Sequence, residues 1–144
     1  MPNGQYVGRH LRPIKEWEHV SMPYGESPGR WKIALMQDGK SEASWTPTPD
    51  MANPFGSVHG GIIATLIDEV TGAAVISSIE AGSAPTVSLN VEYLHAIPIG
   101  GNYTAVGEIV RIGRAMAIAD ARILNEEGKV LARGTCICQI PRPK

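Results

Sequence analysis

A short loop in the middle of the chain carries the residues with the clearest potential for chemistry. The segment Asn53-Pro54-Phe55-Gly56-Ser57-Val58-His59-Gly60-Gly61 runs directly into an apolar helical pattern that carries Asp68 and Glu69. Glycines at the start of a helix leave backbone N–H groups open to close approach, and the helix dipole adds positive potential there. A developing negative charge would be stabilised at this place, with a carboxylate about two turns further along the helix. His-Gly-Gly by itself is also compatible with an ordinary turn.

The helix predicted from Gly61 to about Ile79 places its two carboxylates differently. Six of its apolar residues lie within one broad face at about 100° per residue. They are Ile62, Ile63, Leu66, Ile67, Val70 and Ala74. Asp68 points almost directly away from that face. Its neighbours there are small or weakly polar, namely Ala64, Thr65, Thr71, Gly72 and Val75. This composition indicates that another chain segment or another subunit packs over Asp68, whereas Glu69 is expected to be a structural charge near the edge of the apolar face.

Composition and charge exclude several functional classes. The chain has 144 residues, which corresponds to one domain with a core of ordinary size. A formal net charge of -1, with 13 Lys and Arg residues, gives no electrostatic basis for nucleic-acid binding. No apolar run reaches the roughly 20 residues that a membrane span requires, and the first residues lack the pattern of a signal peptide. We therefore expect a cytoplasmic protein that binds neither nucleic acid nor membrane.

Two cysteines, Cys136 and Cys138, lie two residues apart in a predicted strand. Their Cα atoms would be roughly 6.6 Å apart, at the upper limit for a disulfide on a stiff extended backbone. A metal site would need two further ligands, and none of the four histidines has a ligand-type spacing near them. We expect both cysteines to be reduced on one strand face, and no metal site.

The remaining pattern predicts one helix against an antiparallel sheet. Alternation and turn signals indicate five to six strands, over residues 31–36, 42–46, 86–93, 102–112, 115–124 and 130–140. The strand 86–93 alternates with period two and places four side chains on one face: Val87, Leu89, Val91 and Tyr93. Strands joined by such short turns form an antiparallel sheet, and the single long helix must cover one of its faces. The fold class is therefore α+β.

Residues 1–28 differ from the rest of the chain. They are rich in proline and glycine and contain one possible short helix, over residues 14–20. We predict a partly irregular N-terminal extension over 1–28 and a single domain over 29–144.

The sequence Asn-Pro-Phe-Gly-Ser-Val-His-Gly-Gly, followed by Ile-Ala-Thr-Leu-Ile-Asp-Glu, resembles the hotdog-fold thioesterases of the phenylacetate-degradation (PaaI-like) branch. The resemblance extends from about residue 31 to 140 and includes the turn 111–114 and the strand 128–135. In that family the antiparallel sheet wraps a long helix, and two protomers join their sheets edge to edge with the active sites between them. Dimers often pair into tetramers. The resemblance therefore implies a hotdog domain in a homodimer or homotetramer.

The implied reaction is hydrolysis of an acyl-CoA thioester to the free acid and CoA, with no cofactor apart from the CoA of the substrate. On this resemblance, Asp68 acts as nucleophile or as general base on water. The backbone N–H of Gly60 polarises the thioester oxygen. Asn53 positions the water or the nucleophile, His59 lies beside the carbonyl or the leaving sulfur, and the hydroxyl of Thr86 helps to orient the water.

The resemblance also implies residues that bind the substrate. Gly61 permits its close approach, and Arg114 and Arg111 would meet the nucleotide phosphates of CoA. Each assigned residue keeps a structural alternative: Asn53 and His59 could simply order the loop, and Arg114 could be a solvated turn charge.

Two other functions remain open from the sequence. One is a non-catalytic hotdog protein that binds acyl-CoA or an acyl carrier. The other is a hydratase or dehydratase, which the Asn…His-Gly-Gly…Asp spacing favours less. The acyl group is not identified by the pattern, and three candidate pocket residues, Tyr93, Met116 and Met22, cannot be placed from it.

Overall fold

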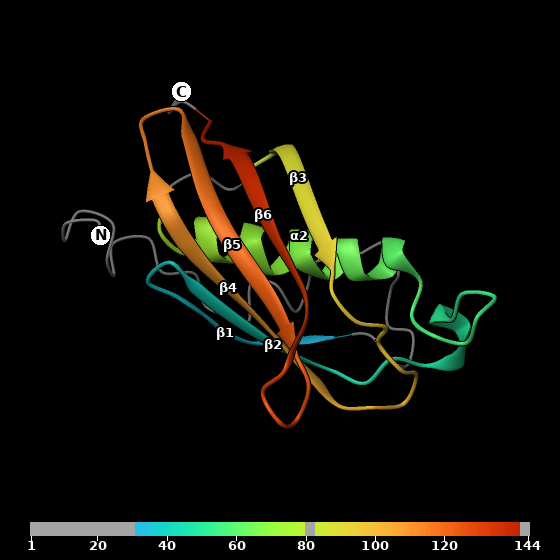
Figure 1. Ribbon diagram of the computed structural model, residues 1–144. Coiled ribbons are helices and arrows are strands. Elements are labelled where there is room, and N and C mark those ends of the chain that lie inside the picture. Colours follow the sequence, from blue (N-terminus) through green and yellow to red (C-terminus); the bar gives the residue numbers. More distant parts are fainter. Residues whose placement is uncertain (1–30, 80–82, 142–144) are drawn as a thin grey trace.

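The computed structural model describes residues 31–79 and 83–141. Within them, one long helix, α2 (Gly60–Ile76), is wrapped by a six-stranded antiparallel sheet (Figure 1). The strands are β1 (Lys32–Gln37), β2 (Lys40–Trp45), β3 (Thr86–Tyr93), β4 (Tyr103–Ile112), β5 (Met116–Leu124) and β6 (Val130–Gln139). A short 3₁₀ helix, η1 (Pro49–Met51), precedes the loop that leads into α2. The predicted α+β domain with five to six strands is confirmed.

Some sequence predictions fall outside these residues. The N-terminal extension over 1–28, its possible helix over 14–20 and Met22 all lie outside the described residues. Within the described ranges, no helix combines the length and the apolar character needed to cross a membrane.

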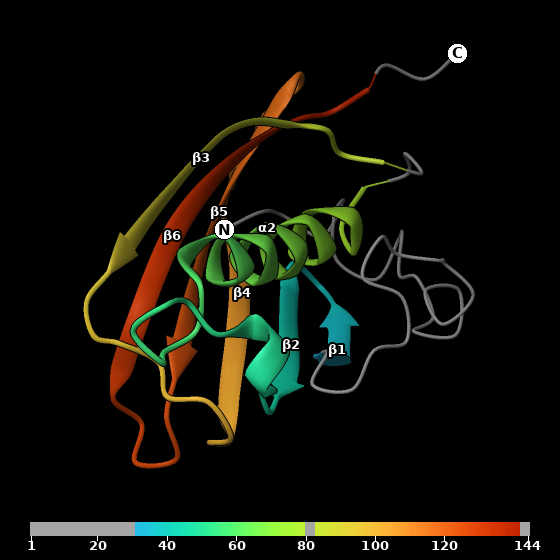
Figure 2. The same cartoon turned by 90° about the vertical axis from the view of Figure 1, so that its right-hand side faces the viewer.

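The strand order is β1-β2-β4-β5-β6-β3, and every neighbouring pair is antiparallel. Figure 2 shows the sheet curving around α2, with β3 and β1 at its two ends. The chain leaves α2 and enters β3, which pairs with β6 on one side only within the described residues. β3 is therefore an edge strand that lies beside the helix.

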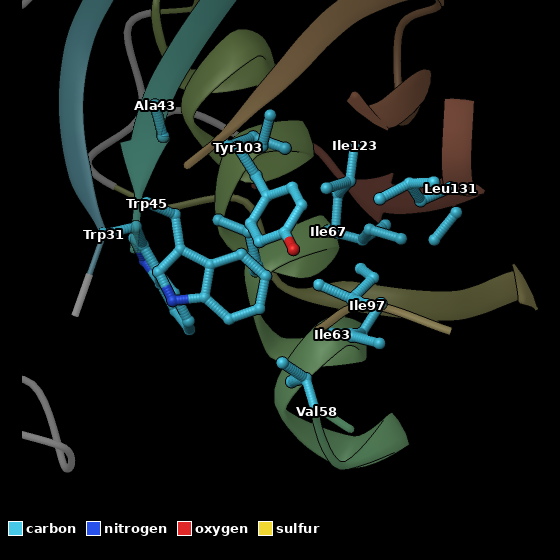
Figure 3. Close-up of a cluster of buried hydrophobic side chains, with 14 of the residues drawn as sticks. Trp31, Ala43, Trp45, Val58, Ile63, Ile67, Ile97, Tyr103, Ile123 and Leu131 are labelled. Atoms are coloured by element: carbon cyan, nitrogen blue, oxygen red, sulfur yellow. The ribbon is translucent and has the colours of Figure 1, made fainter. Parts of the chain in front are cut away.

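The concave side of the sheet packs on one face of α2 and forms the main core (Figure 3). Leu66, Ile67 and Val70 are fully buried in it, as the predicted apolar face requires. Burial of each such side chain contributes about 1.5–3 kcal/mol. The helix also approaches the sheet backbone closely at Gly134, where an added Cβ would lie 2.7 Å from Cγ2 of Ile67. The close packing fixes the position of α2 against β6.

The sheet also covers much of the opposite side of the helix. Thr71 and Val75, on the side of α2 that carries Asp68, are completely buried. Val75 packs in a second core cluster that includes Cys136 and Cys138 of β6. The sequence predicted that another chain segment or another subunit packs over the side of α2 that carries Asp68. Over the second half of the helix, this covering segment is the sheet of the same chain. Asp68 lies at the rim of the covered region and is half-buried.

A β-bulge in β3 changes which side chain faces the helix. The pairing with β6 shifts by one residue between Thr86 and Ser88, which leaves Val87 as an extra residue. Thr86 is paired with the buried Cys138 and faces inward, whereas Val87 is 58% exposed. The predicted alternation is confirmed at Leu89, which packs on the core, and is wrong at Val87. Bulges commonly re-aim a side chain in this way near functional sites.

Candidate active site

The start of α2 is capped by the side chain of His59. This residue has extended backbone angles, and its Nδ1 accepts a hydrogen bond from the backbone N–H of Gly61 at 3.4 Å. Its own N–H donates to the carbonyl of Met51 at 2.8 Å. Because Nδ1 is an acceptor, the neutral imidazole carries its proton on Nε2. His59 therefore both orders the loop and keeps one N–H donor for another group.

Gly60 is the first residue of α2, and its N–H is not used by the loop. The backbone N–H groups of Gly61 and Ile62 donate to the Nδ1 and the carbonyl of His59, respectively. Within residues 31–79 and 83–141, no acceptor lies within hydrogen-bonding distance of the Gly60 N–H. The first N–H groups of a helix have no partner inside the helix and carry the positive end of its dipole. Gly60 therefore offers a donor suited to a negatively charged oxygen.

The side chain of Asn53 organises the loop before the helix. Its Oδ1 accepts from the N–H groups of Phe55 at 2.9 Å and Ser57 at 3.2 Å, and its amide donates to Oγ of Ser57 at 3.4 Å. Gly56, at φ 87°, makes the turn that this arrangement needs. The geometry matches the structural alternative for Asn53, and it presents Phe55, which is 92% exposed, at the tip of the loop.

Asp68 is held by the first residue of β3. The hydroxyl of Thr86 donates to Oδ1 of Asp68 at 2.7 Å. This contact exists because the bulge turns Thr86 toward the helix, and it leaves Oδ2 of the carboxylate without a partner among the described residues. Glu69, one residue further, instead accepts from the indole N–H of Trp31. The two carboxylates thus have the different environments that the helical wheel predicted.

Two thiols lie behind the carboxylate. The sulfur of Cys136 is 3.7 Å from Oγ1 of Thr86, 4.0 Å from Oδ1 of Asp68 and 3.5 Å from the sulfur of Cys138. Both cysteines are buried and reduced, as predicted. The hydrogen bond with Cys138 lowers the pKa of Cys136, and the same contact raises the pKa of Cys138. Sequence reasoning placed the two cysteines on one strand face, but it could not place that face against Asp68, because cross-strand register is not visible in a single strand.

The structure does not bring all the predicted residues together within one chain. Gly60 and Asp68 are eight residues apart on one helix, which separates them by about 12 Å along its axis. Arg114 and Arg111 are exposed on the β4–β5 hairpin. Figure 1 and Figure 2 both place this hairpin at the end of the sheet remote from the loop that precedes α2. The predicted residues therefore form two groups: the helix start with its loop, and Asp68 with Thr86.

Comparison with known proteins identifies the family. A family model described as Thioesterase superfamily matches residues 55–132, which include the helix start, Asp68 and Thr86. The chain belongs to this superfamily. The predicted membership in the hotdog thioesterases is thereby confirmed.

Individual members of the thioesterase superfamily are similar over different lengths. Acyl-coenzyme A thioesterase 13 of Mus musculus is 29% identical over 83 residues, which are 57% of this chain and 59% of the mouse protein. A hypothetical thioesterase from Streptococcus pneumoniae, crystallised with coenzyme A, superposes with a TM-score of 0.73 at 28% identity, covering 80% of this chain and 91% of that one. The PaaI protein of E. coli has the same fold, with a TM-score of 0.73 at 23% identity over 79% of this chain and 81% of that one.

Proposed function

We propose that this protein is an acyl-CoA thioesterase whose active sites are each shared by two copies of the chain. The observation that carries the proposal is the pair of groups at the ends of β3: the N–H of Gly60, which has no partner in the described part of the chain, and the Asp68 carboxylate held by Thr86. An oxyanion donor and a carboxylate are the two groups that thioester hydrolysis needs. Membership in the thioesterase superfamily supports the reaction class.

One chain by itself does not provide this pair at a working distance. A donor lies about 3 Å from the thioester oxygen and an attacking atom about 3 Å from its carbon, so the two groups must lie within about 7 Å of each other. Gly60 and Asp68 of one helix are about 12 Å apart along the axis. The missing group must therefore come from elsewhere.

The edge strand β3 indicates where that group comes from. Its first residue, Thr86, bonds to Asp68, and its last residue, Tyr93, bonds to the carbonyl of Gly60 at 2.8 Å. If two copies pair their β3 strands antiparallel about a two-fold axis, the start of each strand lies beside the end of the other. Asp68 of one copy would then approach the helix start of its partner, and the same pairing would generate two equivalent sites.

The exposed side chains along β3 support this pairing. Val87 is 58% exposed, Tyr93 53% and Leu94, directly after β3, 47%. These three large side chains thus lie along a strand that pairs on one side only within the described residues. Proteins rarely leave such an edge uncovered, because it invites uncontrolled association. A second copy of the same strand would cover both the apolar side chains and the backbone groups.

The proposed reaction uses these groups as follows. Asp68 either attacks the thioester carbon itself or removes a proton from the water that attacks it. The negative charge that develops on the thioester oxygen is stabilised by the Gly60 N–H and the positive end of α2. The carbon–sulfur bond then breaks, and CoA leaves as the thiolate, which a hydrogen bond from the Nε2–H of His59 would stabilise. If Asp68 is the nucleophile, the acyl group is left as an anhydride with Asp68, and water then hydrolyses this anhydride to the free acid. If Asp68 is the general base, the attacking water has already formed the acid when the carbon–sulfur bond breaks.

Arg114 is proposed to bind the nucleotide phosphates of CoA. The strand pairing links Thr86 of β3 to Cys138 of β6, and Cys138 in turn to Ala117 of β5. Arg114 is three residues before Ala117. The hairpin therefore lies at the Thr86 end of the sheet, which is the end that the pairing would bring beside the partner's helix start. Arg111 lies in the same hairpin and would contribute to the same phosphate contacts.

The direct test is a hydrolysis assay with a panel of aromatic, short-chain and medium-chain acyl-CoAs, followed by release of the free thiol. We expect turnover of at least one class by the purified protein. Saturable binding of acyl-CoA without turnover by any class would contradict the proposal and would support the non-catalytic binding protein instead.

Removing the Thr86 hydroxyl is expected to lower kcat by a smaller amount. Thr86→Val keeps the shape of the side chain but removes the hydrogen bond to Asp68 at 2.7 Å. We expect kcat to fall about tenfold, because a lost hydrogen bond to a charged group costs about 1.5–3 kcal/mol, only part of it in the transition state. Thr86→Ser keeps the hydroxyl and should retain most of the activity. Equal activity of the Val and Ser variants would show that Thr86 is only a strand residue.

A further inference from the structure

Tyr93 makes an unusual contact at the start of the helix. It is the last residue of β3, and its hydroxyl donates to the carbonyl of Gly60 at 2.8 Å. Its ring lies flush against the same residue, since a Cβ added to Gly60 would be 3.4 Å from Cζ and from the hydroxyl oxygen. The contact joins residues 33 positions apart in the chain. The end of the edge strand is thus hydrogen-bonded to the helix start.

With this contact, both polar atoms of one peptide group are hydrogen-bonded to side chains. The peptide between Gly60 and Gly61 has its carbonyl bonded by the Tyr93 hydroxyl and its N–H bonded to Nδ1 of His59 at 3.4 Å. With both ends of this peptide engaged, the plane of the peptide is fixed. The neighbouring N–H, that of Gly60, is left unpaired among the described residues and points out of the helix start.

The first turn of α2 needs an external contact of this kind. Two consecutive glycines begin the helix, and glycine loses more conformational freedom in a helix than any other residue. A helix end also frays more readily than its middle. An oxyanion donor stabilises a transition state only if it is already oriented before the reaction. A fraying Gly-Gly turn would not meet that condition.

We propose that Tyr93 is a positioning residue that holds the helix start so that the Gly60 N–H is presented to the thioester oxygen. This inference rests on the proposed thioesterase function. The Tyr93 hydroxyl bonds to the Gly60 carbonyl and not to the Gly60 N–H or the Asp68 carboxylate, so Tyr93 acts through the first turn of α2. Because Tyr93 is at the end of β3, any shift of the edge strand would also shift the oxyanion donor.

Tyr93→Phe removes the hydroxyl and keeps the ring, so it tests the hydrogen bond alone. We expect kcat to fall about fivefold and KM to stay within about twofold, because the lost hydrogen bond affects the orientation of the donor in the transition state. We also expect faster hydrogen exchange at the amide of Ala64, which donates to the Gly60 carbonyl in a regular helix. The exchange measurement does not depend on activity.

Tyr103→Phe is a matched control. Tyr103 also donates its hydroxyl to a backbone carbonyl at 2.8 Å, that of Pro98, which belongs to the segment bridged to Ser57 and not to α2. This variant should leave kcat and the Ala64 exchange rate unchanged. An active wild-type protein with unchanged kcat in Tyr93→Phe would overturn the role of Tyr93 and leave the proposed function intact. A wild-type protein without acyl-CoA hydrolysis would overturn both.

Discussion

Replacing Asp68 by asparagine is expected to lower kcat by about 10²–10⁴-fold, the range typical for loss of a general base or nucleophile. The amide has the size of the carboxylate, and its oxygen can still accept the hydrogen bond that Thr86 donates to Oδ1. It cannot take a proton from water at neutral pH or form an anhydride with the acyl group. The effect should therefore appear in kcat, with KM for acyl-CoA changed by no more than about twofold.

The neighbouring carboxylate gives a matched control for this substitution. Glu69→Gln makes the same chemical change one residue along the helix, at a side chain bonded to the indole of Trp31. We expect its kcat to equal that of the wild type, measured by release of the CoA thiol. If Asp68→Asn retained wild-type turnover, or if Glu69→Gln lost as much as Asp68→Asn, the assignment of the catalytic carboxylate would be wrong.

The sequence was sufficient to predict the elements of the fold, because their patterns are local. The helix and all six strands have boundaries within a few residues of those predicted, since each depends on periodicity and turn residues over a short stretch. Val87 shows where this reasoning ends. Its alternation with Leu89 and Val91 was regular, but the bulge that exposes it arises from the pairing of β3 with β6. Register between distant strands is not encoded in the alternation of one of them.

The same limit applies to the site. Asp68 could be singled out because a helical wheel depends only on residues of one helix. The contact of Thr86 with Asp68 and that of Tyr93 with Gly60 join residues 18 and 33 positions apart. Thr86 was assigned through the family resemblance, and Tyr93 could be named only as a pocket candidate. No local pattern marks Tyr93, because its partner is a backbone carbonyl, which every residue has.

If the active site is shared by two copies, two different inactive variants should restore activity when they are combined in one dimer. Gly60→Pro removes the proposed donor, and proline is well tolerated as the first residue of a helix, where its N–H would have no partner. His59 already has the extended backbone that a following proline requires. Loss of one oxyanion donor costs about 10²–10³-fold in kcat. Gly60→Pro and Asp68→Asn should therefore each be nearly inactive, although each damages a different half of the site.

A dimer that contains one copy of each variant should recover activity. One of its two sites would combine Asp68 from the Gly60→Pro copy with Gly60 from the Asp68→Asn copy, and this site is intact. The other site would carry both defects. A heterodimer purified through two different affinity tags should thus have about half the wild-type kcat per dimer, as two-fold symmetry requires. A heterodimer of Asp68→Asn with Asp68→Ala is the control and should stay inactive. Should the mixed dimer be no more active than its parents, the active site would be contained within one chain, and the pairing of β3 strands would have to be abandoned as its basis.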